Sequence, residues 1–177
     1  MKLRTLDMTY IAVGAVLIAI CSWISIPAAV PFTLQTFAVF VMTGLLGGKR
    51  GTISVLLYIL LGAIGAPVFA GFSGGVGILL GSTGGYIIGF LGSALVMWGM
   101  EKLFGKGLVV QSISMAAGLL ICYAFGTVWF MVVYAQSNGA VSLATVLGWC
   151  VIPFIIPDIL KIALAVIITR RVEKYVQ

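Results

Sequence analysis

Long apolar runs alternate along this chain with short segments rich in glycine, proline or charge. The apolar runs cover residues 8–26, 36–47, 52–65, 83–100, 109–134 and 147–168. A helix needs about 20 apolar residues to cross the roughly 30 Å hydrocarbon core of a bilayer. The pattern predicts an all-α membrane protein with six transmembrane helices, folded as one domain over residues 1–177. The second run would span only about 18 Å at 1.5 Å per residue, so it must borrow from its flanks or lie where the bilayer is thin.

Glycine is concentrated between residues 62 and 92, where eleven of the chain's 23 glycines fall. Because glycine destabilises regular helices, we expect residues 67–82 to form an irregular loop. Irregular backbone at membrane depth is tolerated only where it is buried in protein or lines a cavity. The loop carries many apolar residues and no charge, which favours a lid or wall of a binding site over an exposed flexible connection.

Composition and charge also indicate a membrane protein. Hydrophobic residues make up 62% of the chain, charged residues make up 8%, and the formal net charge is +6. The basic residues outside the apolar runs all fall on one side of the predicted membrane: Lys2, Arg4, Lys49, Arg50, Lys102, Lys106, Arg170, Arg171 and Lys174. By the positive-inside rule both termini are expected in the cytoplasm. Because each basic residue flanks an apolar run, we attribute the charge to membrane anchoring and expect no nucleic-acid partner.

The first apolar run has two interpretations. Its basic start and the Pro27-Ala28-Ala29 sequence that follows it are typical of a cleavable signal peptide. The run is longer than a usual signal core and carries Ala12, Ala15 and Ala19 at helical spacing, so we expect a retained helix with a small-residue face. Such a face lets another helix approach closely. The sequence leaves open whether that helix belongs to a partner protein or to this chain.

The sequence offers little chemistry for catalysis. The chain has no histidine, which removes the commonest metal ligand and the usual general base near neutral pH. Its three cysteines, Cys21, Cys122 and Cys150, lack metal-ligand spacing, and the sequence has no phosphate-binding loop of the P-loop type. We therefore expect no enzyme activity, no metal, no cofactor and no ATP hydrolysis by the chain itself.

Asp158 and Lys161 interrupt the last apolar run. Each ionised side chain costs about 2.5–3.5 kcal/mol at the bilayer centre, so the two need a partner, a ligand or water. Residues three apart share one helix face, which lets one small polar molecule touch both. Pro157 is expected in the first helical turn, where the positive end of the helix dipole attracts negative charge. The alternative is an internal ion pair that holds two helices in register.

Three segments together carry a family resemblance. They are VPFTLQT at residues 30–36, PVFAG at residues 67–71 with the glycine pairs at 74–75 and 84–85 before Tyr86, and Pro157-Asp158 with Lys161. With these motifs the chain closely resembles the BioY family, the biotin-specific substrate-binding subunits of energy-coupling-factor transporters. The resemblance spans residues 8–165. One departure is Ser82, where the family usually has proline, and it bears on the rigidity of the loop.

The resemblance implies six helices, a ligand site that opens outward, and contact of Asp158 and Lys161 with biotin. The chemistry suits this role, because a cyclic urea has two N–H donors and one carbonyl acceptor to match a carboxylate and an ammonium. Secondary candidates for ligand contact are polar residues in the outward loops or at helix ends: Gln35, Thr36, Ser73, Thr83 and Tyr86.

The resemblance also implies partners and a location. The subunit would dock on a transmembrane coupling protein driven by two cytoplasmic ATPases, in the cell membrane of a bacterium. Ala12, Ala15 and Ala19 match the small-residue face that the family uses for docking.

Two other classes of protein stay open. One is a proton-coupled exporter of lipophilic cations that uses Asp158, although the positive charge of Lys161 would repel a cationic substrate. The other is a structural membrane subunit with an internal Asp158–Lys161 pair.

Overall fold

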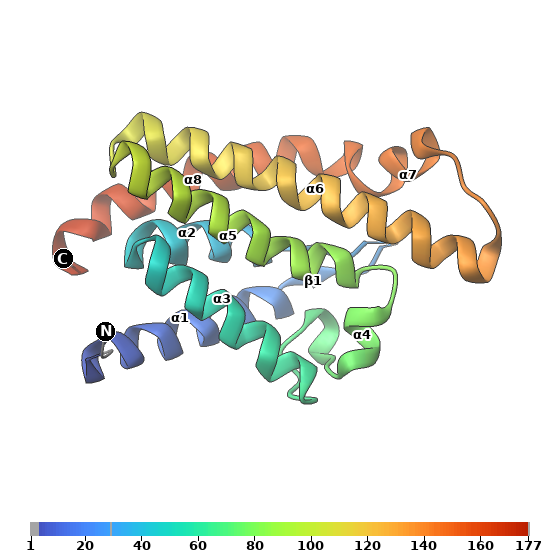
Figure 1. Cartoon of the computed structure of the whole chain (residues 1–177), viewed down its shortest axis with the longest axis horizontal. Helices are drawn as coiled ribbons and strands as arrows, with labels where there is room; N and C mark the ends of the chain where they lie inside the picture. Colours follow the sequence, from blue (N-terminus) through green and yellow to red (C-terminus); the bar gives the residue numbers. More distant parts are fainter. Residues whose placement is uncertain (1–3, 29, 177) are drawn as a thin grey trace.

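The structure of the chain, a computed structural model, describes residues 4–28 and 30–176. Its main helices run roughly along one axis and form a bundle (Figure 1). These helices are α1 (Thr5–Trp23), α2 (Gln35–Leu46), α3 (Gly48–Ala63), α5 (Gly84–Phe104), α6 (Leu108–Asn138) and α8 (Ile152–Val176). Short elements connect them: the strands β1 (Ser25–Ile26) and β2 (Phe32–Thr33), the 3-10 helix η1 (Ala70–Phe72), and the helices α4 (Val76–Leu80) and α7 (Leu143–Cys150).

The length and composition of the helices fit a membrane protein. Within the described residues, α1, α5, α6 and the Ile152–Lys174 part of α8 are long and apolar enough to cross a membrane. Helix α2 has 12 residues and α3 has 16. At 1.5 Å per residue α2 spans about 18 Å, well short of the roughly 30 Å hydrocarbon core. The predicted, mainly helical membrane fold is confirmed, and the number of crossings depends on these two shorter helices.

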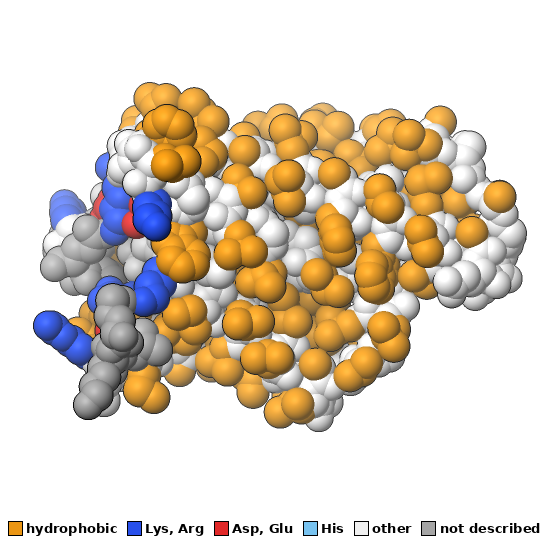
Figure 2. All heavy atoms as spheres, viewed as in Figure 1, with side chains coloured by type: hydrophobic (Ala, Val, Ile, Leu, Met, Phe, Trp, Pro, Cys, Tyr) orange, Lys and Arg blue, Asp and Glu red, His pale blue; other side chains and the backbone are white. Residues whose placement is uncertain are grey.

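Charged side chains gather at one end of the bundle, and the rest of the visible face is largely apolar (Figure 2). Both ends of the chain lie here in Figure 1, together with the α2–α3 and α5–α6 turns. Ion pairs join Arg50 to Asp7 at 2.5 Å and Lys106 to Glu101 at 3.7 Å. We call this the charged end, and the opposite end, with the β1–β2 hairpin, α4 and α7, the uncharged end. Lys2, one of the predicted basic set, lies outside the described residues.

Helices α5 and α6 form the most extensive helix pair in the bundle. Glycines let their backbones approach: a Cβ at Gly126 would overlap the ring of Tyr86, and one at Gly85 would overlap Trp129. Small residues are the usual means of close packing in membranes, where lipid removes the hydrophobic driving force between helices. This contact buries Tyr86 and fixes its position at the uncharged end of α5.

The alanine stripe of α1 divides between the interior and the surface. Ala15 and Ala19 are 2% and 5% exposed and belong to the hydrophobic core, whereas Ala12 is exposed. Helix α1 packs mainly on α3 and α2 of the same chain. The protein itself already covers the side chains of Ala15 and Ala19, and docking of a partner on the alanine stripe stays a prediction. Ala29, in the segment that resembles a signal-peptide cleavage site, lies outside the described residues.

The connecting segments differ from the sequence prediction in four places. Strands β1 and β2 pair as a small antiparallel hairpin, an element that the all-α prediction did not include. The segment 67–82 is not wholly irregular, because it contains η1 and α4. Helix α6 continues through Asn138 and ends at Gly139, whose φ of 84° favours glycine. The last apolar run is divided, since α7 ends at Cys150 and α8 begins at Ile152.

Candidate binding site

A cavity of about 240 Å³ lies at the uncharged end, between the hairpin, the η1 segment and the first turns of α2 and α5. Ligand pockets usually measure about 300–1,000 Å³, so this cavity lies just below the common range and suits only a small molecule. Its wall is mainly apolar with a few polar side chains, and it is formed by Val30, Pro31, Thr33, Gln35, Phe69, Ala70, Ser73, Ile78, Thr83, Tyr86, Ile87 and Phe90.

Four of the five secondary candidates from the sequence line this cavity: Gln35, Ser73, Thr83 and Tyr86. Two of them are held by hydrogen bonds to neighbouring helices. The side-chain amide of Gln35 donates to the Tyr58 hydroxyl at 2.6 Å, and the Tyr86 hydroxyl lies 3.2 Å from Thr127 Oγ1. The structure thus brings these residues together in one wall, and their contact with a ligand stays a prediction.

Phe69 is the most deeply buried residue of the cavity wall and is 1% exposed. Its ring packs edge-on against Tyr58, with ring centroids 5.5 Å apart, and a Cβ at Gly62 would overlap it. The loop that carries Phe69 is also tied to α1, because the indole N–H of Trp23 donates to the Pro67 carbonyl at 2.9 Å. The glycine-rich segment therefore supplies a wall of the cavity, one of the two roles expected of it.

Asp158 and Lys161 form a buried ion pair on α8, with Lys161 Nζ 2.8 Å from Asp158 Oδ1. Their side chains are 3% and 7% exposed. Lys161 also donates to the Thr33 carbonyl at 2.7 Å and to Thr36 Oγ1 at 3.3 Å. The Tyr123 hydroxyl donates to Asp158 Oδ2 at 2.5 Å. This ion-pair network joins β2, α2, α6 and α8, as the internal-pair interpretation expects.

The ion-pair network lies beside the cavity, and neither charged side chain lines it. Thr33 connects the two, because it lines the cavity while its carbonyl accepts the hydrogen bond from Lys161. Thr36, the fifth secondary candidate, contacts the ion pair instead of the cavity. Thr33 therefore lies between the cavity and Lys161.

The position of Pro157 corrects one expectation. Helix α8 begins at Ile152, so Pro157 is its sixth residue and does not lie in the first turn. The argument that exposed N–H groups at a helix start attract a negative charge to this site is therefore wrong. Pro157 instead removes one backbone hydrogen bond inside α8, because proline has no N–H to donate to the carbonyl four residues earlier.

Sequence reasoning missed two tyrosines of the site. Tyr123 lies within a 31-residue apolar helix, where a single aromatic residue looks like ordinary core packing. Tyr58, the partner of Gln35, is hidden in the same way. Thr33 belongs to a quoted motif, but it binds Lys161 through its backbone carbonyl, which any residue type would supply. No residue pattern along the chain signals these three contacts.

Within the described residues no group of three or more His, Cys, Asp or Glu side chains is placed to hold a metal ion. The cavity offers apolar contact, hydrogen bonds and a neighbouring ion pair. Fold and site together define a helical membrane protein with a binding site for a small organic molecule. The chain belongs to the BioY family, whose family model matches residues 1–177.

Relatives and a solved structure agree with this grouping. The chain is 41% identical over 159 residues to the biotin transporter BioY of Thermotoga maritima, covering 89% of this chain and 90% of that protein. It is 38% identical over 163 residues to the biotin transporter BioY2 of Lactococcus lactis subsp. cremoris, covering 91% and 86%. Its fold matches the crystal structure of the S-component for biotin from an ECF-type ABC transporter, with a TM-score of 0.84 and 32% identity over 95% of this chain and 90% of that chain. The family resemblance predicted from the motifs is confirmed.

Proposed function

We propose that this chain binds biotin and serves its uptake as the substrate-binding subunit of an energy-coupling-factor transporter. It is a transporter subunit and not an enzyme. The carrying observation is the cavity of about 240 Å³ at the uncharged end, whose wall contains residues from the family motifs. The whole-length similarity to biotin transporters and to a biotin S-component supports this assignment.

The free hydrogen-bonding capacity of the ion pair suggests how biotin binds. A carboxylate has about four acceptor positions, and Asp158 uses three of them for Lys161, Thr36 and Tyr123. An ammonium has three N–H donors, and all three of Lys161 are engaged. We therefore place a urea N–H of biotin on the remaining acceptor position of Asp158. Lys161 keeps its ion pair with that carboxylate. It donates to the urea carbonyl once its hydrogen bond to the Thr33 carbonyl is broken.

The remaining contacts follow from the cavity wall. The ring system and the aliphatic chain of biotin pack on the apolar wall formed by Phe69, Ile87 and Phe90. Gln35, Ser73, Thr83 and Tyr86 supply polar contacts, and Thr36 acts through the ion pair. Biotin is the transported ligand here, and the proposal includes no cofactor.

The proposed topology has six crossings, made by α1, α2, α3, α5, α6 and α8 in a single domain over residues 1–177. Both termini lie in the cytoplasm, and the protein resides in the cytoplasmic membrane of a bacterial cell. The support is the segregation of charge, since the basic residues near Arg50 and Lys106 share one end of the bundle (Figure 2). The cavity then faces outward.

The proposed partners are a transmembrane coupling protein and two cytoplasmic ATPases. The support is the similarity to an S-component from an ECF-type ABC transporter, together with the lack of an ATP-binding motif in this sequence. Energy for uptake then arrives through contact between subunits. Of the alanine stripe on α1, Ala12 is the residue that the fold leaves exposed for such contact.

Binding of radiolabelled biotin to the purified chain tests the function. We expect saturable binding of one biotin per chain, which unlabelled biotin displaces. A folded chain that binds no biotin would contradict the proposal. In that case efflux of lipophilic cations would separate the exporter that uses Asp158 from a structural subunit with an internal Asp158–Lys161 pair.

A further inference from the structure

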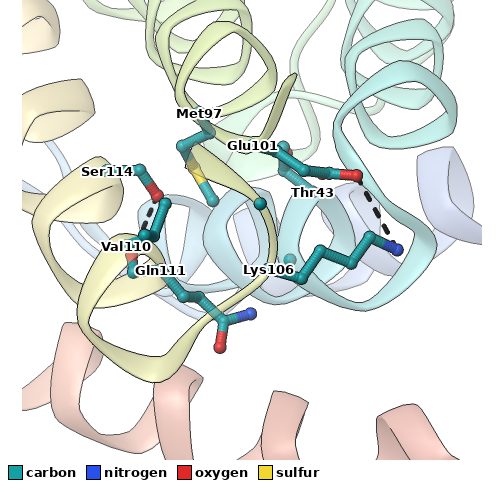
Figure 3. Close-up of a pocket in the computed structure, with 9 residues that line it drawn as sticks. Thr43, Met97, Glu101, Lys106, Val110, Gln111 and Ser114 are labelled. Carbon is teal, nitrogen blue, oxygen red and sulfur yellow. Dashed lines mark hydrogen bonds and ion pairs between the residues drawn. The ribbon is translucent and has the colours of Figure 1, made fainter. Parts of the chain in front are cut away.

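A second, much smaller hollow lies at the charged end, near the other end of α2 from the ligand cavity (Figure 3). Its volume is about 20 Å³, and a water molecule needs about 10–15 Å³ measured in the same way. Residues from α2, α5, α6 and the α5–α6 turn surround it, with the Glu101–Lys106 ion pair on one side: Thr43, Gly44, Met97, Glu101, Gly105, Lys106, Val110, Gln111 and Ser114.

The wall of this hollow contains a buried hydroxyl that needs a partner. Thr43 is 1% exposed, and no hydrogen-bond partner reaches its Oγ1 within the described part of the chain. A buried hydroxyl left unpaired destabilises the fold, because it has given up its hydrogen bonds to water. Ser114, which lines the same hollow, donates its hydroxyl hydrogen to the Gln111 carbonyl at 2.9 Å and keeps acceptor positions for a further donor.

We propose that one ordered water molecule occupies this hollow, accepting the hydrogen of the Thr43 hydroxyl and donating to Ser114 or to the Glu101 carboxylate. The site is specific for water by size, because the hollow has room for one molecule only. The Glu101–Lys106 pair, at 3.7 Å and with side chains 28% and 40% exposed, forms the entrance from the charged end.

A bound water here has a consequence for the membrane-spanning part of α2. Gln35 lines the ligand cavity and Thr43 lines the hollow, and these residues are eight positions apart on one helix. At 1.5 Å per residue, about 12 Å of dry protein separates the two. A 12-residue helix is therefore long enough to cross the membrane at this place, because polar surroundings extend inward from both of its ends. The dry layer consists of the buried residues Ala38, Val39, Phe40, Val41 and Met42.

The first test asks whether removal of the Thr43 hydroxyl lowers or raises the melting temperature. Threonine and valine have the same shape and similar helix propensity, so Thr43→Val removes the hydroxyl and little else. If water is bound, this variant loses a hydrogen bond, and we expect the melting temperature in detergent to fall by about 2–4 °C. The matched control is Thr169→Val, because Thr169 Oγ1 is also buried without a partner among the described residues but does not line the hollow. Thr169→Val should leave the melting temperature unchanged or raise it.

The second test detects the water directly. Met97 lines the hollow and is only 4% exposed, so hydroxyl radicals reach its sulfur efficiently only from a water bound beside it. Brief X-ray radiolysis in H₂¹⁸O should oxidise Met97 with ¹⁸O, whereas Met115, which is 0% exposed and outside the lining, should stay unmodified. Thr43→Val should suppress the labelling of Met97. Biotin binding should be unchanged, which separates this proposal from the proposed function.

Either of two results would overturn the proposal. One is stabilisation by Thr43→Val to the extent seen for Thr169→Val, which marks a dry hollow. The other is a Met97 that is labelled no more than Met115.

Discussion

The hydrogen-bonding capacity of single side chains is the basis of the roles proposed for Asp158 and Lys161. Lys161 has every N–H engaged, while Asp158 keeps one acceptor position. A buried ion pair is often neutral for stability as a whole, yet removing one partner strands the other charge at high cost. The pair is thus suited to hold a carboxylate in place for a ligand while it ties the hairpin to α8.

At this scale we predict that Asp158→Asn and Lys161→Ala each weaken biotin binding by about 1–3 kcal/mol, or roughly 5–150-fold in Kd. The reason is that each change leaves a buried polar partner unpaired. The effects should be less than additive in the double variant, because both groups act on one ligand. Equilibrium binding to purified protein is the measurement, and Lys102→Ala, an exposed change at the charged end, is the control. Normal binding by both folded single variants would make the pair purely structural.

Tyr123→Phe removes one hydroxyl and keeps the ring in place. Because that hydroxyl is a donor to a charged oxygen, Asp158 Oδ2, we expect a loss of about 1.5–3 kcal/mol in stability. Biotin affinity should fall less than in Asp158→Asn, since the charge remains. Tyr134→Phe on the same helix is the matched control, measured by the same thermal unfolding and binding assays. If Tyr123→Phe and Tyr134→Phe have the same stability and the same biotin affinity, Tyr123 has no role in the site.

At the scale of elements, close contact between helices depends on small residues at defined positions. Gly126 accommodates the ring of Tyr86 between α5 and α6, and Gly62 accommodates Phe69 between α3 and the glycine-rich segment. Both aromatic residues line the ligand cavity. The glycines therefore shape the site without touching it, since they set how closely aromatic walls approach the helices.

Two substitutions on α1 separate its inner and outer faces. Ala15→Trp places a large ring where the core has no room, and we expect a lowered melting temperature and weakened biotin binding. Ala12→Trp lies on the exposed face and should leave folding and binding intact. If this face meets the coupling protein, Ala12→Trp should also lower uptake and co-purification of the partners. An Ala15→Trp variant that binds biotin normally but fails to assemble would contradict this expectation and support docking through the buried alanines.

At the scale of the whole molecule, the segregation of charge gives the bundle a direction. The charged end holds the basic turns and the ends of the chain, and the ligand cavity lies at the other end. Anchoring of basic residues on the cytoplasmic side then orients the cavity outward, toward the ligand source.

Accessibility of introduced cysteines tests this orientation. In a background with Cys21→Ser, Asn138→Cys and Ser73→Cys should react with an impermeant thiol reagent applied from outside the cell. Lys49→Cys and Lys106→Cys should react only after the membrane is opened, because they lie at the charged end. Reaction of all four from outside would contradict the six-crossing topology.

The sequence by itself determined the features that depend on local composition. Apolar runs of helical length predicted the helices, since burial in lipid requires internal hydrogen bonding over the whole run. Basic residues at the ends of these runs predicted one charged end, and the motifs at residues 30–36, 67–71 and 157–161 identified the family.

The tertiary structure decided the features that depend on residues far apart in the chain. It buried Ala15 while leaving Ala12 exposed, because the direction of a helix face is set by its neighbours. It also placed Thr33 between Lys161 and the cavity through a backbone carbonyl, an atom that carries no sequence signal. Packing of β2, α2, α6 and α8 against one another thus converted two charges in an apolar run into a satisfied network beside a ligand cavity.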